Sequence, residues 1–297
     1  MRRIIAITLG DPSGIGPEVV RKALRSGKLD RRFRYEVVLG SEIPRVAPGR
    51  PSRLGARFAL RALEAGVAGC LDGRYAALVT GPVNKAALKA AGFRFPGQTE
   101  WLAARTGAKA FAMMLVGGRL RIALVTIHTP LRDVPRLLSR RKVRETIRLA
   151  HAALRRFGIR QPKIAVAALN PHGGAAGEEG IEERRIVAPA VRDARRRRLG
   201  GEITGPHTPD AIFRDAWRGK VDAVVCMYHD QGLIPLKMVA FDQGVNLTLG
   251  LPIVRTSPDH GTAYALAGKN RADPGSLIAA IRLAAKLSAR GGKVRPI

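Results

Sequence analysis

Short apolar runs alternate with amphipathic helical patterns along the whole chain, and this alternation restricts the fold more than any other feature. The runs are rich in Val, Ile and Ala and almost continuously apolar, which is typical of strands covered on both faces. The sequence therefore predicts a mostly parallel sheet flanked by helices. The predicted strands are Arg3–Leu9, Tyr35–Leu39, Tyr75–Thr80, Leu120–Ile127, Lys163–Leu169 and Asp222–Met227. The predicted helices are Pro17–Ser26, Arg53–Ala65, Asn84–Ala91, Thr99–Thr106, Lys142–Phe157, Glu182–Arg198 and Pro274–Ala289.

A chain of 297 residues, 46% of them hydrophobic, can bury a core large enough for one α/β unit or two intertwined lobes. No apolar run reaches the roughly 20 residues that cross a bilayer. The apolar N-terminal run is strand-length and meets Gly10 and Asp11 without a cleavage region, so we expect a cytoplasmic protein. Cys70 and Cys226 lie far apart in apolar surroundings, which predicts small core residues.

The formal charge is +29, but the basic residues are spread over the chain. Small clusters occur at 31–32, 140–142 and 195–198, without interleaved aromatic residues and without helix-turn-helix or zinc-finger spacing. Solvated basic faces are the favoured interpretation, and a basic nucleic-acid-binding protein is the less favoured alternative. A charge of this sign also steers anionic substrates toward the protein.

Three of the six histidines directly follow predicted strands: His128, His172 and His229. Parallel strands bring their carboxyl ends to one edge of the sheet, where ligands bind in open α/β sheets. Imidazole suits Zn²⁺ and other borderline metals, and three such ligands leave positions open for a substrate. The alternative is that each is a polar loop residue. His151 is predicted on a helix face, and His207 in a turn.

Two acidic residues and a polar series accompany these histidines. Asp230 follows His229, and Asp210 closes a turn; either could orient a ligand or act as an acid or base, and the alternative is a helix cap or turn residue. Lys237, Asn246 and Arg255 are spaced nine residues apart. An ammonium, an amide and a guanidinium directed at one pocket would bind phosphate or carboxylate.

Two glycine-containing segments, 10–16 and 80–85, each follow a strand and open a helix, so their backbone amides could face an anion. Neither is a GxGxxG or a GxxxxGK[ST] motif. The sequence therefore contains no standard Rossmann or P-loop fingerprint.

Several stretches together resemble the 4-hydroxythreonine-4-phosphate dehydrogenase family of pyridoxal phosphate biosynthesis. They span nearly the whole chain: Thr8–Glu18, Gly81–Lys85, Leu169–His172, Met227–Gly232, Asn246–Pro252 and Arg255–Thr262. The resemblance implies the isocitrate/isopropylmalate-dehydrogenase-like α/β fold, with two α/β/α lobes and the active site in the cleft between them. We place the first, cofactor-side lobe at 1–125 plus 256–297, and the second, with the metal site and dimer contact, at 126–255.

The resemblance also implies the reaction: NAD(P)-dependent oxidation and decarboxylation of 4-phosphooxy-L-threonine to 3-amino-2-oxopropyl phosphate and CO₂. It implies a homodimer with a metal site shared between subunits and one divalent ion per site (Zn, Mg, Mn or Co). From the scattered charge and the short apolar runs, we expect no nucleic-acid or membrane partner. The metal ligands fall on His128, His172 and His229, and the catalytic candidates are Asp210, Asp230 and Lys237. Substrate-binding positions fall on Gln98, Thr99, Lys237, Asn246 and Arg255, and cofactor-binding positions on His260, Gly261, Thr262 and Asn270.

One substrate-side position departs from the family pattern. Gln98 stands where the family usually has a histidine that contacts substrate. Glutamine still donates a hydrogen bond, but it carries no charge at any pH. This leaves open a sister dehydrogenase acting on 4-phospho-D-threonate, 4-phospho-D-erythronate or a terephthalate cis-diol.

Overall fold

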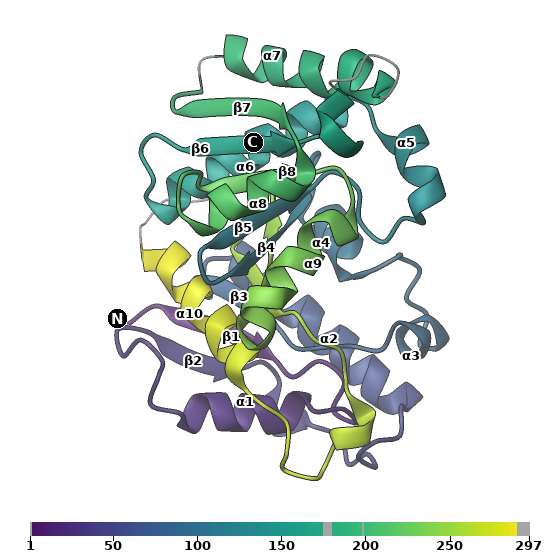
Figure 1. The fold of residues 1–297 in the computed structure, drawn as a ribbon. Helices are drawn as coiled ribbons and strands as arrows, with labels where there is room; N and C mark the ends of the chain where they lie inside the picture. The colour runs from purple at the N-terminus through teal and green to yellow at the C-terminus, as the bar shows by residue number, and fades with distance from the viewer. Residues whose placement is uncertain (1, 175–179, 198, 290–297) are drawn as a thin grey trace. The chain divides into compact units, whose positions relative to one another are not determined.

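The chain divides into two units, each built on β-strands covered by helices (Figure 1). The computed structural model describes residues 2–174, 180–197 and 199–289. The first unit contains residues 2–109 and 242–289, and the second contains residues 110–241. The boundaries predicted from the sequence, at 125/126 and 255/256, lie later in the chain than those of the structure, at 109/110 and 241/242. Residues 290–297 of the predicted first lobe lie outside the described residues.

In the first unit the strand order is β2-β1-β3-β10-β9. The neighbours from β2 to β10 are parallel, and β9 runs antiparallel to β10. Buried aliphatic residues of β1 and β3, such as Ile5 and Leu78, form the middle of this core, so the strands are apolar on both faces. The strands are β1 (Ile4–Thr8), β2 (Arg34–Val37), β3 (Ala77–Thr80), β9 (Val245–Leu249) and β10 (Arg255–Pro258).

Helices from both ends of the chain cover this sheet. α10 packs on β10, β3 and β9 with α1 beside it, and α2 packs on β1 and β3. Ser52 caps α2 by accepting from the N–H of Gly55, and Asn84 caps α3 in the same way. The helices are α1 (Gly16–Arg25), α2 (Arg53–Leu71), α3 (Lys85–Ala90), α4 (Gln98–Thr106) and α10 (Gly275–Ala289).

In the second unit the strand order is β4-β5-β8-β6-β7. β4 and β5 form an antiparallel hairpin around residues 118–119, and β5, β8, β6 and β7 are parallel neighbours. The parallel strands therefore end at one edge, as the sequence predicts. The strands are β4 (Ala112–Gly117), β5 (Leu120–Leu124), β6 (Lys163–Ala167), β7 (Glu202–His207) and β8 (Ala223–Cys226).

α9 packs on β4, β5 and β8, α6 packs on β5, β6 and β8, and α7 packs on α6 and β7. Gly232 allows the close approach of α9, because a Cβ there would lie 2.4 Å from Cγ2 of Ile122. Cys226 belongs to this core, as predicted, whereas Cys70 is half-buried. The helices are α5 (Val134–Leu137), α6 (Arg140–Phe157), α7 (Ala188–Arg196), α8 (Pro209–Trp217) and α9 (His229–Ala240).

All six predicted strands are present, and four further strands in the described residues were not predicted: β4, β7, β9 and β10. The helical pattern missed α5, α8 and α9. The predicted helix from Glu182 is a π-helical segment, Glu183–Val187, continued by α7, and its predicted end at Arg198 lies outside the described residues. Among the residues described, no helix is both long and apolar enough to cross a membrane.

Candidate functional site

Buried side chains tie together the strand ends that precede the three candidate metal ligands. Thr126, after β5, donates its hydroxyl to the carbonyl oxygen of Met227, after β8, at 2.8 Å. Gln231 accepts from the N–H of Met227 and donates to the carbonyl oxygen of Ala168, after β6, at 2.7 Å each. Because Gln231 is only 8% exposed, it holds the ends of β6 and β8 in a fixed relation.

His128 and His229 lie beside each other in the second unit. Their ring centroids are 5.6 Å apart, and the rings are tilted by 39°. His229 begins α9, and its Nδ1 lies 2.6 Å from Oδ1 of Asp230. When Nδ1 carries the proton and donates it to Asp230, Nε2 presents its lone pair to a ligand, as in carboxylate-oriented metal histidines.

His172 follows β6 in a segment held by a buried carboxylate. Oε1 of Glu183 accepts from the backbone N–H of Leu169 and of Asn170, and Oε2 accepts from the Asn170 amide at 2.9 Å. Burial acts to raise the pKa of Glu183, but these hydrogen bonds outweigh it and lower the pKa. His172 itself is exposed and has a left-handed backbone, with φ 55°.

The paired rings of His128 and His229, with Asp230 orienting one of them, fit two ligands of a divalent ion by their donor chemistry. Within the part of the chain that the structure describes, no group of three His, Cys, Asp or Glu side chains is placed to hold a metal. His172 is therefore not gathered with the other two in this chain, and the three-histidine site stays a prediction.

The other second-unit candidates lie on helices. Asp210 is exposed in the first turn of α8, where the positive end of the helix dipole stabilises a carboxylate. Lys237, in α9, has its Nζ 5.7 Å from the ring centroid of Phe241. His151 is buried in α6 and pairs with the carbonyl oxygen of Gly200. His207 ends β7 rather than forming a turn, because its segment pairs with β6.

The first unit contains a buried guanidinium with neutral partners. Arg255 is 4% exposed. It donates to the hydroxyl of Thr80 from Nε and Nη2, to that of Thr248 from Nη1, and to Oε1 of Gln98 from Nη2. Burial lowers the pKa of Arg255 to about 10, so it is still charged at neutral pH. A buried charge without a carboxylate partner is costly unless an anion binds there.

The remaining predicted first-unit substrate residues supply polar groups. Gln98 and the buried Thr99 open α4, whose N-terminal N–H groups are suited to anions. The Oδ1 atom of Asn246, on β9, is buried without a hydrogen-bond partner. Such an orphaned atom fits a ligand donor. Thr80 and Thr248 were not predicted, because a threonine in a strand sequence gives no sign that its hydroxyl faces a guanidinium.

The predicted cofactor segment follows β10. Nε2 of His260 is buried without a hydrogen-bond partner, which fits a polar atom of a bound cofactor. The buried Thr262 accepts the N–H of Ile15 on its carbonyl oxygen, and Gly261 and Asn270 are exposed. Asn270 has a left-handed backbone, with φ 56°.

Non-glycine residues with a left-handed backbone occur in the candidate site segments of both units. Among the described residues, five non-glycine residues have clearly positive φ, and four of them fall in these segments. Such conformations are uncommon and cluster at functional sites. The five are Leu39, His128, His172, Ala263 and Asn270.

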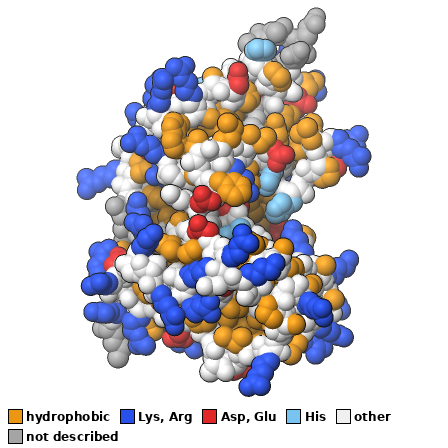
Figure 2. Space-filling view, turned by 60° about the horizontal axis from the view of Figure 1, so that its bottom comes forward, with side chains coloured by type: hydrophobic (Ala, Val, Ile, Leu, Met, Phe, Trp, Pro, Cys, Tyr) orange, Lys and Arg blue, Asp and Glu red, His pale blue; other side chains and the backbone are white. Residues whose placement is uncertain are grey.

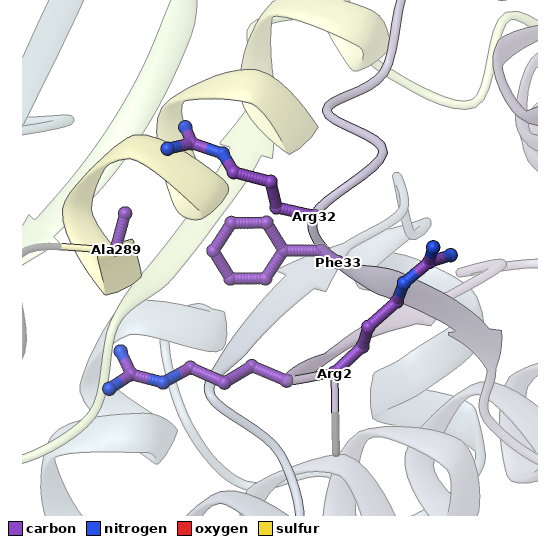
Figure 3. A pocket seen from close by; sticks show the side chains of 5 residues that line it. Arg2, Arg32, Phe33 and Ala289 are labelled. Atoms are coloured by element: carbon purple, nitrogen blue, oxygen red, sulfur yellow. The ribbon is translucent and has the colours of Figure 1, made fainter.

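A separate hollow of about 620 Å³ in the first unit contains none of the predicted residues (Figure 3). It is lined by Arg2, Arg3, Arg32, Phe33 and Ala289. Arg32 is exposed and already paired with Asp30, and Arg3 donates to the carbonyl oxygen of Ser288. We assign no role to this hollow.

Comparison with known proteins places these residues in a family. Residues 18–284 match the pyridoxal phosphate biosynthetic protein PdxA family. A 4-hydroxythreonine-4-phosphate dehydrogenase of Desulfosudis oleivorans is 45% identical, with 98% of each chain covered. The crystal structure of the enzyme of that name from Klebsiella pneumoniae is 36% identical, with a TM-score of 0.82 over 96% of this chain and 99% of the other.

Two further solved structures are similar to this chain, with lower sequence identity and TM-scores. A terephthalate 1,2-cis-dihydrodiol dehydrogenase of Burkholderia xenovorans is 28% identical, with a TM-score of 0.69 over 96% of this chain and 98% of that one. An isocitrate dehydrogenase of Methylococcus capsulatus is 14% identical, with a TM-score of 0.52 over 96% and 84%. The latter confirms the predicted fold class. With most of the chain matched, this protein belongs to the pyridoxal phosphate biosynthetic protein PdxA family of dehydrogenases.

Proposed function

We propose that the chain oxidises and decarboxylates 4-phosphooxy-L-threonine to 3-amino-2-oxopropyl phosphate and CO₂, with reduction of NAD or NADP, in pyridoxal 5'-phosphate biosynthesis. The names of its relatives support this substrate. The observation that carries it is the buried guanidinium of Arg255, whose partners Thr80, Thr248 and Gln98 are all neutral. A dianionic phosphate is the kind of ligand that would neutralise it.

The residues divide the chemistry between two sets. Arg255, Gln98, Thr99 and Asn246 hold the anionic end of the substrate, and Lys237 adds a further cation. His128, His172 and His229 hold a divalent cation (Zn, Mg, Mn or Co), with Asp230 orienting His229. When bound, that cation lowers the pKa of the substrate hydroxyl and stabilises the enolate charge left by decarboxylation.

The remaining chemistry needs proton transfer and a hydride acceptor. A bound nicotinamide cofactor would supply the acceptor for the hydride that leaves the carbinol carbon. Asp210, Asp230 and Lys237 are the candidates for accepting the hydroxyl proton and protonating the enolate. The segment around His260, Gly261, Thr262 and Asn270 binds the adenosine side of the cofactor, supported by the orphaned Nε2 of His260.

We propose that the enzyme is a homodimer with its metal site shared between subunits. The support is α9, which begins at His229 and exposes an apolar face. Ile234, Met238 and Phe241 are spaced four and three residues apart and are 59%, 81% and 71% exposed. Ile234 and Met238 lie one turn apart on α9, and Phe241 directly follows the end of the helix, so a second copy of the chain would cover them together.

A sister activity is the second candidate, because Gln98 replaces the usual histidine and because a terephthalate cis-diol dehydrogenase is structurally similar. NADH or NADPH formation is measured with 4-phosphooxy-L-threonine, 4-phospho-D-threonate, 4-phospho-D-erythronate and the cis-diol. We expect the highest kcat/KM with 4-phosphooxy-L-threonine. A higher value with another member would replace the proposed substrate.

Metal dependence is tested on the same assay. Chelation followed by dialysis should abolish turnover, and adding back Zn²⁺, Mg²⁺, Mn²⁺ or Co²⁺ should restore it. The same metal ions should not restore the activity of the His172→Ala variant. Near-normal activity after chelation would contradict the metal site.

A further inference from the structure

The segment from β1 through α1 holds the loop 259–273 at two separated places. Near its start, Ile15 donates its N–H to the carbonyl oxygen of Thr262 at 3.0 Å, and Tyr264 donates its hydroxyl to the buried carboxylate of Asp11 at 2.5 Å. Gly14 permits this approach, because a Cβ would lie 2.8 Å from the carbonyl oxygen of Thr262. The glycine-containing segment 10–16 therefore binds protein backbone rather than an anion at these positions.

Near the end of the loop, the ion pair of Glu18 and Lys22 on α1 holds the backbone of Asn270 and Ala272. Lys22 Nζ donates to Oε1 of Glu18 at 2.8 Å and to the carbonyl oxygens of Asn270 and Ala272 at 2.9 Å each. The same Glu18 oxygen accepts the N–H of Ala272 at 2.8 Å. The three bonds that Lys22 donates use all three hydrogens of its ammonium group.

The Glu18–Lys22 ion pair contacts the backbone of Asn270 and can therefore affect its conformation. The Glu18 side chain is 7% exposed and that of Lys22 is 27% exposed, so water screens the contact weakly. Asn270 itself is exposed with a left-handed backbone, a conformation that persists only where the surrounding structure holds it. Lys22 supplies that constraint by binding the Asn270 carbonyl oxygen.

We propose that Glu18 and Lys22 are positioning residues for the nicotinamide cofactor, which they act on by fixing the backbone of Asn270 and Ala272. This inference rests on the proposed function, in which loop 259–273 binds the cofactor. Neither side chain need touch the cofactor. Their effect falls on cofactor affinity and leaves the binding of the phosphorylated substrate and the chemical step unchanged.

The test compares Lys22→Met and Glu18→Gln with matched controls. Arg21→Met removes a charge from an exposed position of the same helix, and Glu145→Gln neutralises the acid of another i,i+4 pair, with Arg141 on α6. The Kd values of NADH and NADPH are measured by fluorescence titration without substrate. We then measure kcat, the substrate KM at saturating cofactor and the cofactor KM at saturating substrate.

We expect Lys22→Met to raise the Kd of the reduced cofactor about tenfold. Glu18→Gln should raise it only about threefold, since the amide oxygen that replaces the carboxylate can still accept from the N–H of Ala272. Substrate KM and kcat should stay within twofold of the parent, and the controls should leave Kd unchanged. A Kd within twofold of the parent for Lys22→Met, with normal turnover in the parent, would overturn this inference alone. Failure of the parent to bind either cofactor would overturn it together with the proposed function.

Hydrogen exchange of the cofactor-free protein gives a second readout. In Lys22→Met, peptides covering 259–273 should exchange faster, while peptides of the second unit exchange at the parent rate. Faster exchange throughout would mean general destabilisation, and unchanged exchange in the loop would mean that Lys22 does not hold it; either result overturns the proposal.

Discussion

At the scale of single residues, Arg255 is the most informative side chain. It is buried and charged, and its partners are hydroxyls and an amide. A structural arginine at such a place would normally be matched by a carboxylate. The spacing of Lys237, Asn246 and Arg255 predicts an anion site only weakly, and the neutral surroundings of Arg255 strengthen that hypothesis for this residue.

Arg255→Met should lower kcat/KM about 100-fold or more, equal to about 3 kcal/mol of lost charge-assisted binding. The free energy of unfolding in urea should stay the same or rise, because an unpaired buried guanidinium is removed. Arg121→Met, a control in the second unit, should leave kcat/KM unchanged. A large loss of stability with retained activity would identify Arg255 as a structural residue.

We expect the residue at position 98 to determine how substrate binding depends on pH. Its Oε1 accepts from Arg255, so its uncharged amide nitrogen is the donor left for substrate. In Gln98→His, an imidazole titrating near pH 6.5 would add charge in acid. At each pH, we divide the substrate KM of this variant by that of the unsubstituted protein. This ratio should be several-fold lower at pH 6 than at pH 8. A variant-to-parent ratio that is flat with pH would show that position 98 does not contact the anion.

At the scale of elements, the ends of β5, β6 and β8 are joined by side chains that lie outside any predicted site. Gln231 lies in α9, which the sequence did not predict because Gly232 and Pro235 are weak helix formers. The helix forms nevertheless, since its buried residues Leu233 and Leu236 pack on the sheet of the second unit. Tertiary packing overrides propensity here.

Gln231→Leu should reduce the free energy of unfolding by about 2–4 kcal/mol, because the N–H of Met227 and the carbonyl oxygen of Ala168 lose their buried partner. Urea unfolding measures this change. Gln161→Leu is the control, as exposed Gln161 also accepts a backbone N–H, from Gly201. Equal effects of the two substitutions would contradict a special role for Gln231.

At the scale of the whole molecule, the positive charge and the apolar face of α9 have different consequences. Lys and Arg side chains are scattered over the face seen in Figure 2 rather than gathered in one patch. Scattered charge favours solubility and the steering of anions. The exposed apolar residues Ile234 and Met238 of α9 and Phe241 at its end instead lie within eight positions of the chain, which is the pattern of a protein contact.

Met238→Glu should therefore shift the protein from dimer to monomer in sedimentation equilibrium, because a charge would be buried at the interface. Metal-dependent activity should fall with the dimer fraction. Leu54→Glu changes another exposed apolar residue, on α2 of the first unit, and should leave the mass unchanged. A Met238→Glu protein that remains dimeric would place the subunit contact elsewhere.

Sequence periodicity predicted β1, β3, β5, β6 and β8 because their apolar runs are largely buried, and this property is local. It missed β9 and β10, where Asn246, Thr248 and Arg255 interrupt the apolar pattern. It also missed the hairpin strand β4, whose run contains two methionines and a glycine. These strands form because neighbouring strands supply hydrogen bonds, which no single segment encodes.

The sequence by itself determined the fold class, the family, and the residues that carry donors and charge: three histidines after strands, and Arg255 in a series with Lys237 and Asn246. Only the tertiary structure decided which of them meet. It placed His128 beside His229, gave Arg255 its neutral partners, and brought Glu18 and Lys22 against a loop some 250 positions later in the chain. The physical reason is that residue chemistry and periodicity are local, whereas burial and hydrogen-bond partners depend on segments brought together by packing.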